Sequence, residues 1–287
     1  MSLRPASPDD IGGITAFLRG RLEGSMFLMS NLAAHGLNGT HSNAMRLWVA
    51  GRRPVAGVVG LTNGGMVLPQ WPDGDWAALR PLVGSRPIAG LVGEAGQVDA
   101  ARRALGLGSN ATRLASNEHG FTLDLAALRL PESADFQLRI PGPDDRAVMV
   151  AWRRFALEET QGVQPDASLA LATRDVEGWI ARGSHRLLVH GDVPVSMTGF
   201  NASLPDAVQV GGVYTPPALR GRGHARRAVG LHLAEARARG VGRAILFASN
   251  PAAIRAYRSL GFVPQGRIAL VLFPASVAVP FSAGNHP

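Results

Sequence analysis

Apolar residues recur along the chain in alternating strand-like and helical segments, a pattern that predicts an α/β protein. The second half shows it most clearly. Its strand-like runs are 186–190, 195–201, 208–214, 244–248 and 268–273, and its helical patterns are 147–159, 169–182, 225–240 and 251–260. The first two of these strands flank a turn that contains Gly191 and Pro194, so they predict a hairpin.

The first half repeats this order of segments in a weaker form. Its strand-like runs are 47–50, 55–61, 66–68, 87–92 and 119–125, and its helical patterns are 11–22 and 96–105. The first two strands again flank a Gly- and Pro-containing turn and predict a hairpin. The similar order indicates that the chain has two related halves.

The two halves also begin alike. Residues 3–10 read LRPASPDD and residues 138–145 read LRIPGPDD, and a helical pattern follows each of them. The Pro-Asp-Asp run supplies a helix cap and acidic residues for the first turn. The repeat favours a duplication, although a short repeat can also arise by chance. A polar, Pro-containing seam at 130–135 predicts two domains, 1–130 and 136–287.

Composition narrows the class of protein. The chain has 287 residues, 46% of them hydrophobic, which is enough for two packed cores, and it has no Cys. No apolar run reaches the roughly 20 residues that span a bilayer, and the first residues lack the apolar core of a signal peptide. We therefore expect a soluble cytoplasmic protein that does not bind membranes. No His, Asp and Glu residues have metal-ligand spacing, so no metal is expected.

The positive charge is concentrated in one segment. The formal net charge is +8, yet residues 220–267 alone hold ten Arg against one acid, Glu235, so the rest of the chain is nearly neutral. A local cationic field suits a ligand with several phosphates. Nucleic acid is the weaker alternative, because such surfaces are usually spread out and interleaved with aromatic residues.

The loop at 220–225 lies in the middle of the most informative stretch. It reads Arg-Gly-Arg-Gly-His-Ala, with a β-rich run before it and a long helical pattern after it. Small residues allow backbone N–H groups to approach a phosphate, and the first helical turn adds its positive dipole end. The loop lacks the Gly-Lys-Ser/Thr of a P-loop and the third glycine of a dinucleotide-binding fingerprint. A simple strand-to-helix turn is the other reading.

Two motifs in this stretch resemble the GNAT superfamily of N-acetyltransferases. Arg220, Gly223 and Ala225 fill the fixed positions of its acyl-CoA loop, Gln/Arg-x-x-Gly-x-Gly/Ala. Residues 250–262 then match its second signature, Asn-x-x-Ala-x-x-x-Tyr-x-x-x-Gly-Phe. The resemblance covers about 136–273 and implies two tandem GNAT-like domains, each a central mixed β-sheet flanked by helices. The first half lacks the loop motif, so it is predicted to be a degenerate copy that does not bind CoA in the usual way.

The resemblance implies that acetyl-CoA is the co-substrate. Its pyrophosphate would bind the backbone amides of 222–225, and its pantetheine would extend beside the strand that ends at 213–215, with a bulge at Gly211 and Gly212 opening the gap. The predicted acyl-CoA-binding residues are Val213, Tyr214, Thr215, Arg220, Gly221, Arg222, Gly223, His224, Ala225, Asn250, Ala253 and Tyr257.

Transfer to an amine needs an acid for the departing thiolate and a route for the amine proton. Tyr257, at the motif position, is the predicted general acid, with a packed aromatic as the alternative. Glu158 and Glu159, near the end of the first helix of the second half, are candidates for contact with the acceptor, although each is also a typical solvated acid. The acceptor is a small-molecule or peptide amine that the sequence does not identify, and a homodimer is possible. The competing hypothesis is a non-catalytic acyl-CoA-binding sensor or interaction protein.

Overall fold

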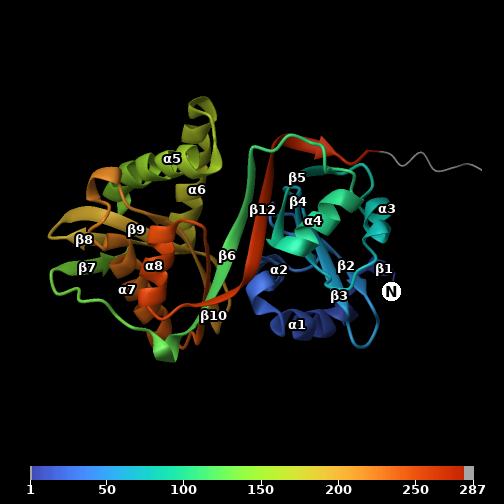
Figure 1. Cartoon of the computed structure of the whole chain (residues 1–287), viewed down its shortest axis with the longest axis horizontal. Helices are drawn as coiled ribbons and strands as arrows, with labels where there is room; N and C mark the ends of the chain where they lie inside the picture. The colour runs from blue at the N-terminus through green and yellow to red at the C-terminus, as the bar shows by residue number, and fades with distance from the viewer. Residues whose placement is uncertain (1, 281–287) are drawn as a thin grey trace, which may run out of the picture. The chain divides into compact units, whose positions relative to one another are not determined.

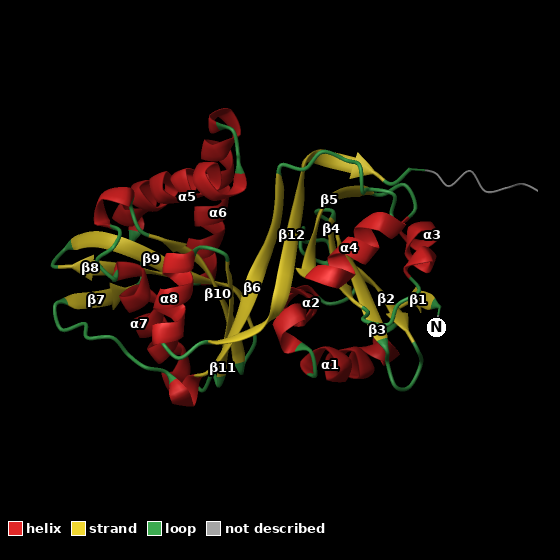
Figure 2. Cartoon of the chain, in the orientation of Figure 1, coloured by secondary structure: helices red, strands yellow, loops and turns green. Residues whose placement is uncertain are grey.

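A computed structural model describes residues 2–280 of the chain and divides it into two units (Figure 1). Unit 1 comprises residues 2–118 together with 266–280, and unit 2 comprises residues 119–265. Each unit is an α/β structure with helices and a mixed sheet (Figure 2), and the strands follow an equivalent spatial order in both sheets.

Unit 1 has the strand order β1-β2-β3-β4-β5-β12 within the described residues. All neighbouring strands are antiparallel except β4 and β5, which are parallel. The strands are β1 (Leu3–Pro5), β2 (Met45–Ala50), β3 (Gly57–Thr62), β4 (Met66–Gln70), β5 (Pro87–Glu94) and β12 (Val263–Ala278). The helices are α1 (Ile11–Arg19), α2 (Leu22–His35), α3 (Leu79–Val83) and α4 (Ala95–Ala104).

Unit 2 has the equivalent order β7-β8-β9-β10-β11-β6, with β10 and β11 as its parallel pair. Its strands are β6 (Leu114–Asp124), β7 (Phe136–Arg139), β8 (His185–His190), β9 (Val193–Ser203), β10 (Ala207–Tyr214) and β11 (Arg243–Ala248). Its helices are α5 (Arg146–Gln161), α6 (Pro165–Arg182), α7 (His224–Ala238) and α8 (Pro251–Ser259). Glycines in the left-handed conformation, Gly162 and Gly183, end α5 and α6.

The helices of unit 2 cover both faces of its sheet. Leu187 and Leu188 are adjacent in β8, so their side chains point to opposite faces. Leu187 packs in the core formed with α5 and α6, whereas Leu188 packs against Ala228 of α7. A third core joins α7 and α8 to β10, β11 and β6. The sheet of unit 2 is therefore a layer between two pairs of helices.

The sixth strand of each unit comes from the other half of the sequence. Residues 119–124 of β6 pair with β11 in unit 2. Residues 268–278 of β12, red in Figure 1, pair with β5 in unit 1. The units thus differ from the predicted segments 1–130 and 136–287 by the exchange of these two strands. Alternation of apolar residues indicates that a strand has a buried face, but it does not indicate which edge the strand pairs with.

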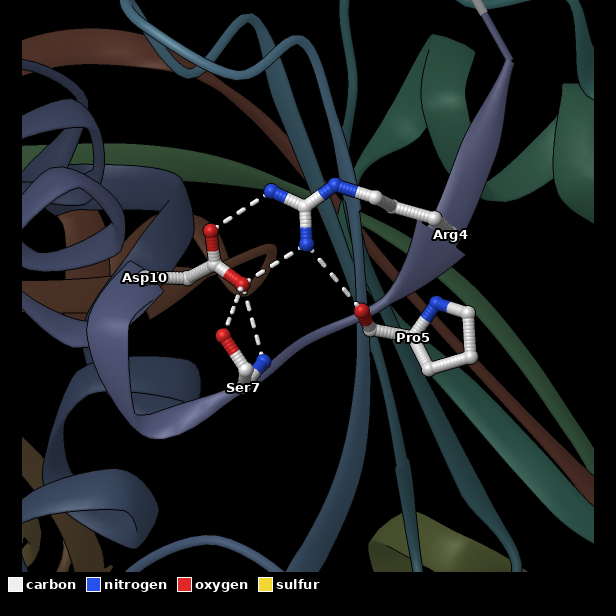
Figure 3. A network of polar contacts seen from close by, with 4 residues as sticks. All are labelled: Arg4, Pro5, Ser7 and Asp10. Atoms are coloured by element: carbon white, nitrogen blue, oxygen red, sulfur yellow. Dashed lines mark hydrogen bonds and ion pairs between the residues drawn. The ribbon is translucent and has the colours of Figure 1, made fainter.

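The repeated opening sequence folds into the same polar network in both units. In unit 1, Arg4 donates two hydrogen bonds to the Asp10 carboxylate at 2.6 and 2.7 Å, and Asp10 also accepts from the Ser7 backbone N–H and hydroxyl (Figure 3). In unit 2, Arg139 donates to Asp145 at 2.5 and 2.8 Å, and Asp145 accepts from the Gly142 backbone N–H at 2.7 Å. The shared geometry supports a duplication.

We expect Asp145→Asn to lower the free energy of unfolding by about 1–2 kcal/mol at pH 7, because it weakens a charged hydrogen bond and a helix cap. The hydrogen bonds from Arg139 hold the pKa of Asp145 below its usual range. Its stabilising effect is therefore present above the unfolded pKa of about 3.9 and is lost as the pH falls through the lower folded value. Denaturant unfolding from pH 7 to pH 2 measures the free energy of unfolding of the variant and the unmodified protein. The control is Asp144→Asn at the exposed neighbouring position. Equal stability of both variants would contradict the prediction.

Two helices of unit 1, α2 and the short α3, are absent from the sequence-based prediction. The pattern at 11–22 indicates a single helix, whereas the structure has α1 and then α2, which is 14 residues long. Apolar side chains lie on several sides of α2, with Leu22, Met26, Leu28 and Met29 all buried. Because such a helix has no distinct polar face, its 3.6-residue period is hard to recognise.

Candidate active site

A cavity of about 890 Å³ lies in unit 2 where the parallel strands β10 and β11 separate. The two strands pair over 207–209 and 243–245 only, within the described part of the chain. Beyond this point the register of β10 against β9 shifts between Gly211 and Tyr214, and Gly212 has a left-handed φ of 61°. The predicted bulge is therefore present. It opens the sheet toward α5 and α6 on one side and toward α7 and α8 on the other.

The N-terminus of α7 forms one end of the cavity. Gly221 and Gly223 have left-handed φ values of 79° and 77°, so glycine suits both positions. No side chain caps α7, and its first turn contains no acid. The cavity-lining Arg226, in that turn, has a buried Nε without a hydrogen-bond partner in the described chain. Open N–H groups at a helix N-terminus form a typical binding site for phosphate.

The helix α8 forms the neighbouring wall and differs from α7 at its start. The Asn250 side chain accepts hydrogen bonds from the backbone N–H groups of Ala252 and Ala253, so α8 is capped by its own sequence. Tyr257 follows two turns later, is 8% exposed, lines the cavity and packs edge-on against Phe262. The second signature thus places two of its residues, the small Ala253 and the phenol of Tyr257, at the cavity.

Arg220 connects the 220–225 loop to α5. Its guanidinium donates to both carboxylate oxygens of Glu159 at 2.7 Å and to the Thr215 backbone carbonyl at 3.0 Å. These hydrogen bonds hold the pKa of Glu159 below its usual range. Arg220 also lies over the ring of Tyr214, whose pKa is raised by burial. Both residues of this ion pair line the cavity.

Most of the residues predicted from the sequence meet in this cavity. Those that line it are Glu159, Val213, Tyr214, Thr215, Arg220, Gly221, Gly223, His224, Ala225, Asn250, Ala253 and Tyr257. Glu158 and Arg222 are outside this set. Glu158 accepts hydrogen bonds from Ser168 at 2.6 Å and Arg154 at 2.9 Å, and both lower its pKa. In the structure Glu158 joins α5 to α6 and does not line the cavity, and its contact with the acceptor stays a prediction.

Comparison with known proteins identifies the family. The model of the acetyltransferase (GNAT) family matches residues 149–262, which form most of unit 2. Unit 2 thus contains a GNAT family match over residues 149–262. This confirms the resemblance that the two motifs carry. No curated protein sequence matches the chain.

Solved structures extend the GNAT comparison to both units. A tandem GNAT protein from the clavulanic acid biosynthesis pathway has 17% identity and a TM-score of 0.54, covering 98% of this chain and 99% of its own. A GCN5-related N-acetyltransferase from Kribbella flavida has 18% identity and a TM-score of 0.57, covering 88% and 95%. A Drosophila protein has 15% identity and a TM-score of 0.65, covering 95% and 98%. At these identities the likeness establishes the fold alone, and the predicted tandem GNAT fold is confirmed.

Sixteen of the 28 residues that line the cavity are outside the sequence-based prediction, and four of them form a charged and aromatic group on α5 and α6. Arg153 of α5 and Asp175, Trp179 and Arg182 of α6 line the cavity on the side of these two helices. Asp175, Trp179 and Arg182 are spaced i, i+4 and i+7, which places them on one face of α6. That spacing is visible in the sequence, but no motif indicates that this face borders the cavity.

The corresponding gap in unit 1 is filled by the chain itself. The parallel pair β4 and β5 is short, and Trp71, which follows β4, is 2% exposed. The Trp71 backbone N–H donates to Gln97 Oε1 at 2.5 Å, and Gln97 Nε2 donates to Gln70 Oε1 at 3.3 Å. Gln97 is the third residue after Glu94, the cap of α4, just as Ala253 is the third after Asn250 in α8. A long polar side chain thus occupies in unit 1 the position that alanine leaves open in unit 2.

The described residues place two limits on other kinds of site. Between residues 2 and 280, no three His, Cys, Asp or Glu side chains are grouped so that they could hold a metal ion. In the same range, every helix is too short or too polar to cross a membrane.

Proposed function

We propose that unit 2 transfers the acetyl group of acetyl-CoA to a primary amine by direct attack, with Tyr257 as the general acid. The observation that carries the proposal is the meeting of both motifs in one cavity, with the open N-terminus of α7 at one end and Tyr257 in the adjacent wall. The GNAT family and fold support acyl transfer to nitrogen in general. The acetyl group, the amine and the role of Tyr257 belong to the proposal.

The cavity offers a partner for each part of the donor. The N–H groups at the start of α7, together with Arg226, suit the phosphates. The separated ends of β10 and β11 leave strand N–H and C=O groups for the pantetheine amides. Ten arginines follow residue 219, yet many already have partners within the chain, Arg220 with Glu159 and Arg239 with Glu235 among them. This charge distribution suits a compact anion better than a nucleic-acid surface.

In the proposed reaction the amine nitrogen forms a bond to the thioester carbonyl carbon, and the carbon–sulfur bond breaks. Tyr257 donates its phenolic proton to the departing sulfur, and the amine proton leaves to solvent. Glu159 is a poor proton acceptor, because its ion pair with Arg220 lowers its pKa. We assign Glu159 to holding the 220–225 loop instead.

Under the same proposal, unit 1 does not bind acyl-CoA. Its side chains already satisfy the amide of Trp71, and no Gly-rich loop precedes the five-residue helix α3. The first half of the sequence would then contribute to unit 2 through strand β6, which pairs with β11, or would contribute only to stability. We expect the protein to act in the cytoplasm as a single-site enzyme.

Isothermal titration calorimetry with acetyl-CoA, free CoA and a longer acyl-CoA tests these points. We expect one site per chain and the tightest binding for acetyl-CoA. Two sites would contradict the closed gap in unit 1. If none of the three ligands binds, the proposed function is refuted and only the similarity of the fold remains. Binding without transfer to any amine would favour the non-catalytic sensor instead.

A further inference from the structure

The cavity wall formed by α5 and α6 contains a rigid set of side chains that neither GNAT motif includes. Arg153 donates to Asp175 at 2.7–2.8 Å, and the two side chains are only 18% and 26% exposed. The Arg153 guanidinium also lies 5.3 Å from the centre of the Trp179 ring. Asp175 is therefore held by an arginine before any ligand arrives.

Trp179 is fixed from within the unit. Its ring stacks on His185 with 3.8 Å between the centroids and 13° between the planes. His185 is 1% exposed, and burial, followed by the charges of nearby arginines, lowers its pKa to about 3. The imidazole is thus neutral at physiological pH and adds no charge to this wall. The wall is preorganised, because the rotamers of Trp179 and Arg153 are already set by packing.

Arg182 differs from the other charged residues of this wall. It is exposed, it lines the cavity, and no acid among the described residues pairs with it. Glu159, the second acid of the cavity, is occupied on both oxygens by Arg220. Each carboxylate of the lining thus already has its arginine.

The lining as a whole is cationic. It contains five arginines and two acids, a net charge of +3: Arg153, Arg182, Arg220, Arg226 and Arg255 against Glu159 and Asp175. Arg226 and Arg255 belong to α7 and α8, the helices that carry the proposed acyl-CoA site. Arg182, at the end of α6, belongs to the opposite wall. Binding of the acyl-CoA phosphates would use Arg226 and Arg255. Arg182 then stays available for another ligand.

From this charge balance we infer that the acceptor is an amine that also carries a carboxylate, such as an amino acid, and that Arg182 binds the carboxylate. A polyamine or another purely cationic acceptor would find no unpaired carboxylate and would have to break one of the two ion pairs. A carboxylate next to Arg182 instead gains a charge-assisted hydrogen bond. This inference rests on the proposed function of unit 2.

The test uses the full chain, acetyl-CoA and three sets of acceptors: the twenty common amino acids, their amides, and putrescine with spermidine. Release of CoA is followed with a thiol reagent, whose signal comes from CoA alone because the chain has no Cys. We expect transfer to one or more amino acids and at least tenfold less to the matching amides.

Arg182→Gln should raise KM for the preferred amino acid about 10- to 100-fold, the loss expected for one charged hydrogen bond. It should leave KM for the amide and the Kd for acetyl-CoA unchanged. Arg182→Lys keeps the charge and should give an intermediate KM. The matched control is Arg174→Gln, which removes an exposed arginine of the same helix that does not line the cavity.

The outcomes separate this inference from the proposed function. Equal use of amides or polyamines, or an unchanged KM in Arg182→Gln, would overturn the carboxylate assignment while amine acetylation stands. Acetyl-CoA binding without transfer to any amino acid would overturn it as well. Absence of acetyl-CoA binding would refute the proposed function itself.

Discussion

Ala253→Gln should weaken acetyl-CoA binding by about 100-fold or more. Ala253 lines the cavity at the third position after the helix cap, where unit 1 has Gln97. In unit 1 that glutamine accepts a hydrogen bond from the Trp71 backbone N–H at the end of the short parallel pair. The same side chain in unit 2 should occupy the gap between β10 and β11 and bond the amides that pantetheine would use. Two lost hydrogen bonds amount to about 3 kcal/mol, or roughly 100-fold in Kd.

Titration calorimetry of Ala253→Gln with acetyl-CoA measures this effect, and thermal unfolding checks that the fold is retained. Ala167→Gln makes the same chemical change at an exposed position of α6 outside the cavity lining and should bind normally. Tight binding by Ala253→Gln would show that pantetheine does not lie in the strand gap. The result also bears on unit 1, because it tests whether this glutamine alone is enough to close such a gap.

The sequence predicts the parts of the site that depend on local rules. Asn250 caps α8 through its side chain, and Gly221 and Gly223 take the left-handed conformations that a tight loop needs. These residues determine their own backbone geometry, so a short motif is enough to find them. The strand–loop–helix order then places the loop at the N-terminus of α7. The structure adds that this terminus is uncapped.

Local sequence rules do not predict the features of the site that depend on tertiary contacts. The ion pair of Arg220 with Glu159 joins residues 61 positions apart, and it makes Glu159, but not Glu158, a cavity residue. The two glutamates are adjacent in α5, so only the docking of the loop against the helix distinguishes them. The closed gap of unit 1 has the same origin, since Gln97 is polar in sequence but 7% exposed in the fold.

Tyr257→Phe should lower kcat for amine acetylation by about 10²- to 10⁴-fold, the usual size of a general-acid contribution. The departing thiolate needs a hydrogen-bond or proton donor at the moment when the carbon–sulfur bond breaks, and a phenol can supply it. Removing the hydroxyl leaves the ring, which packs against Phe262. The Kd for acetyl-CoA should therefore change by less than about threefold, and the loss should appear in kcat rather than in binding.

The comparison that decides this role uses the chain's other tyrosine. The chain has two tyrosines, and Tyr214 also lines the cavity but packs with Trp152 in the core of α5 and α6. If Tyr257 alone is the general acid, then Tyr214→Phe lowers kcat far less than Tyr257→Phe in the same assay. Equal losses in both variants would assign the effect to the shared cavity environment. A normal kcat in Tyr257→Phe would mean that solvent, and not Tyr257, protonates the thiolate.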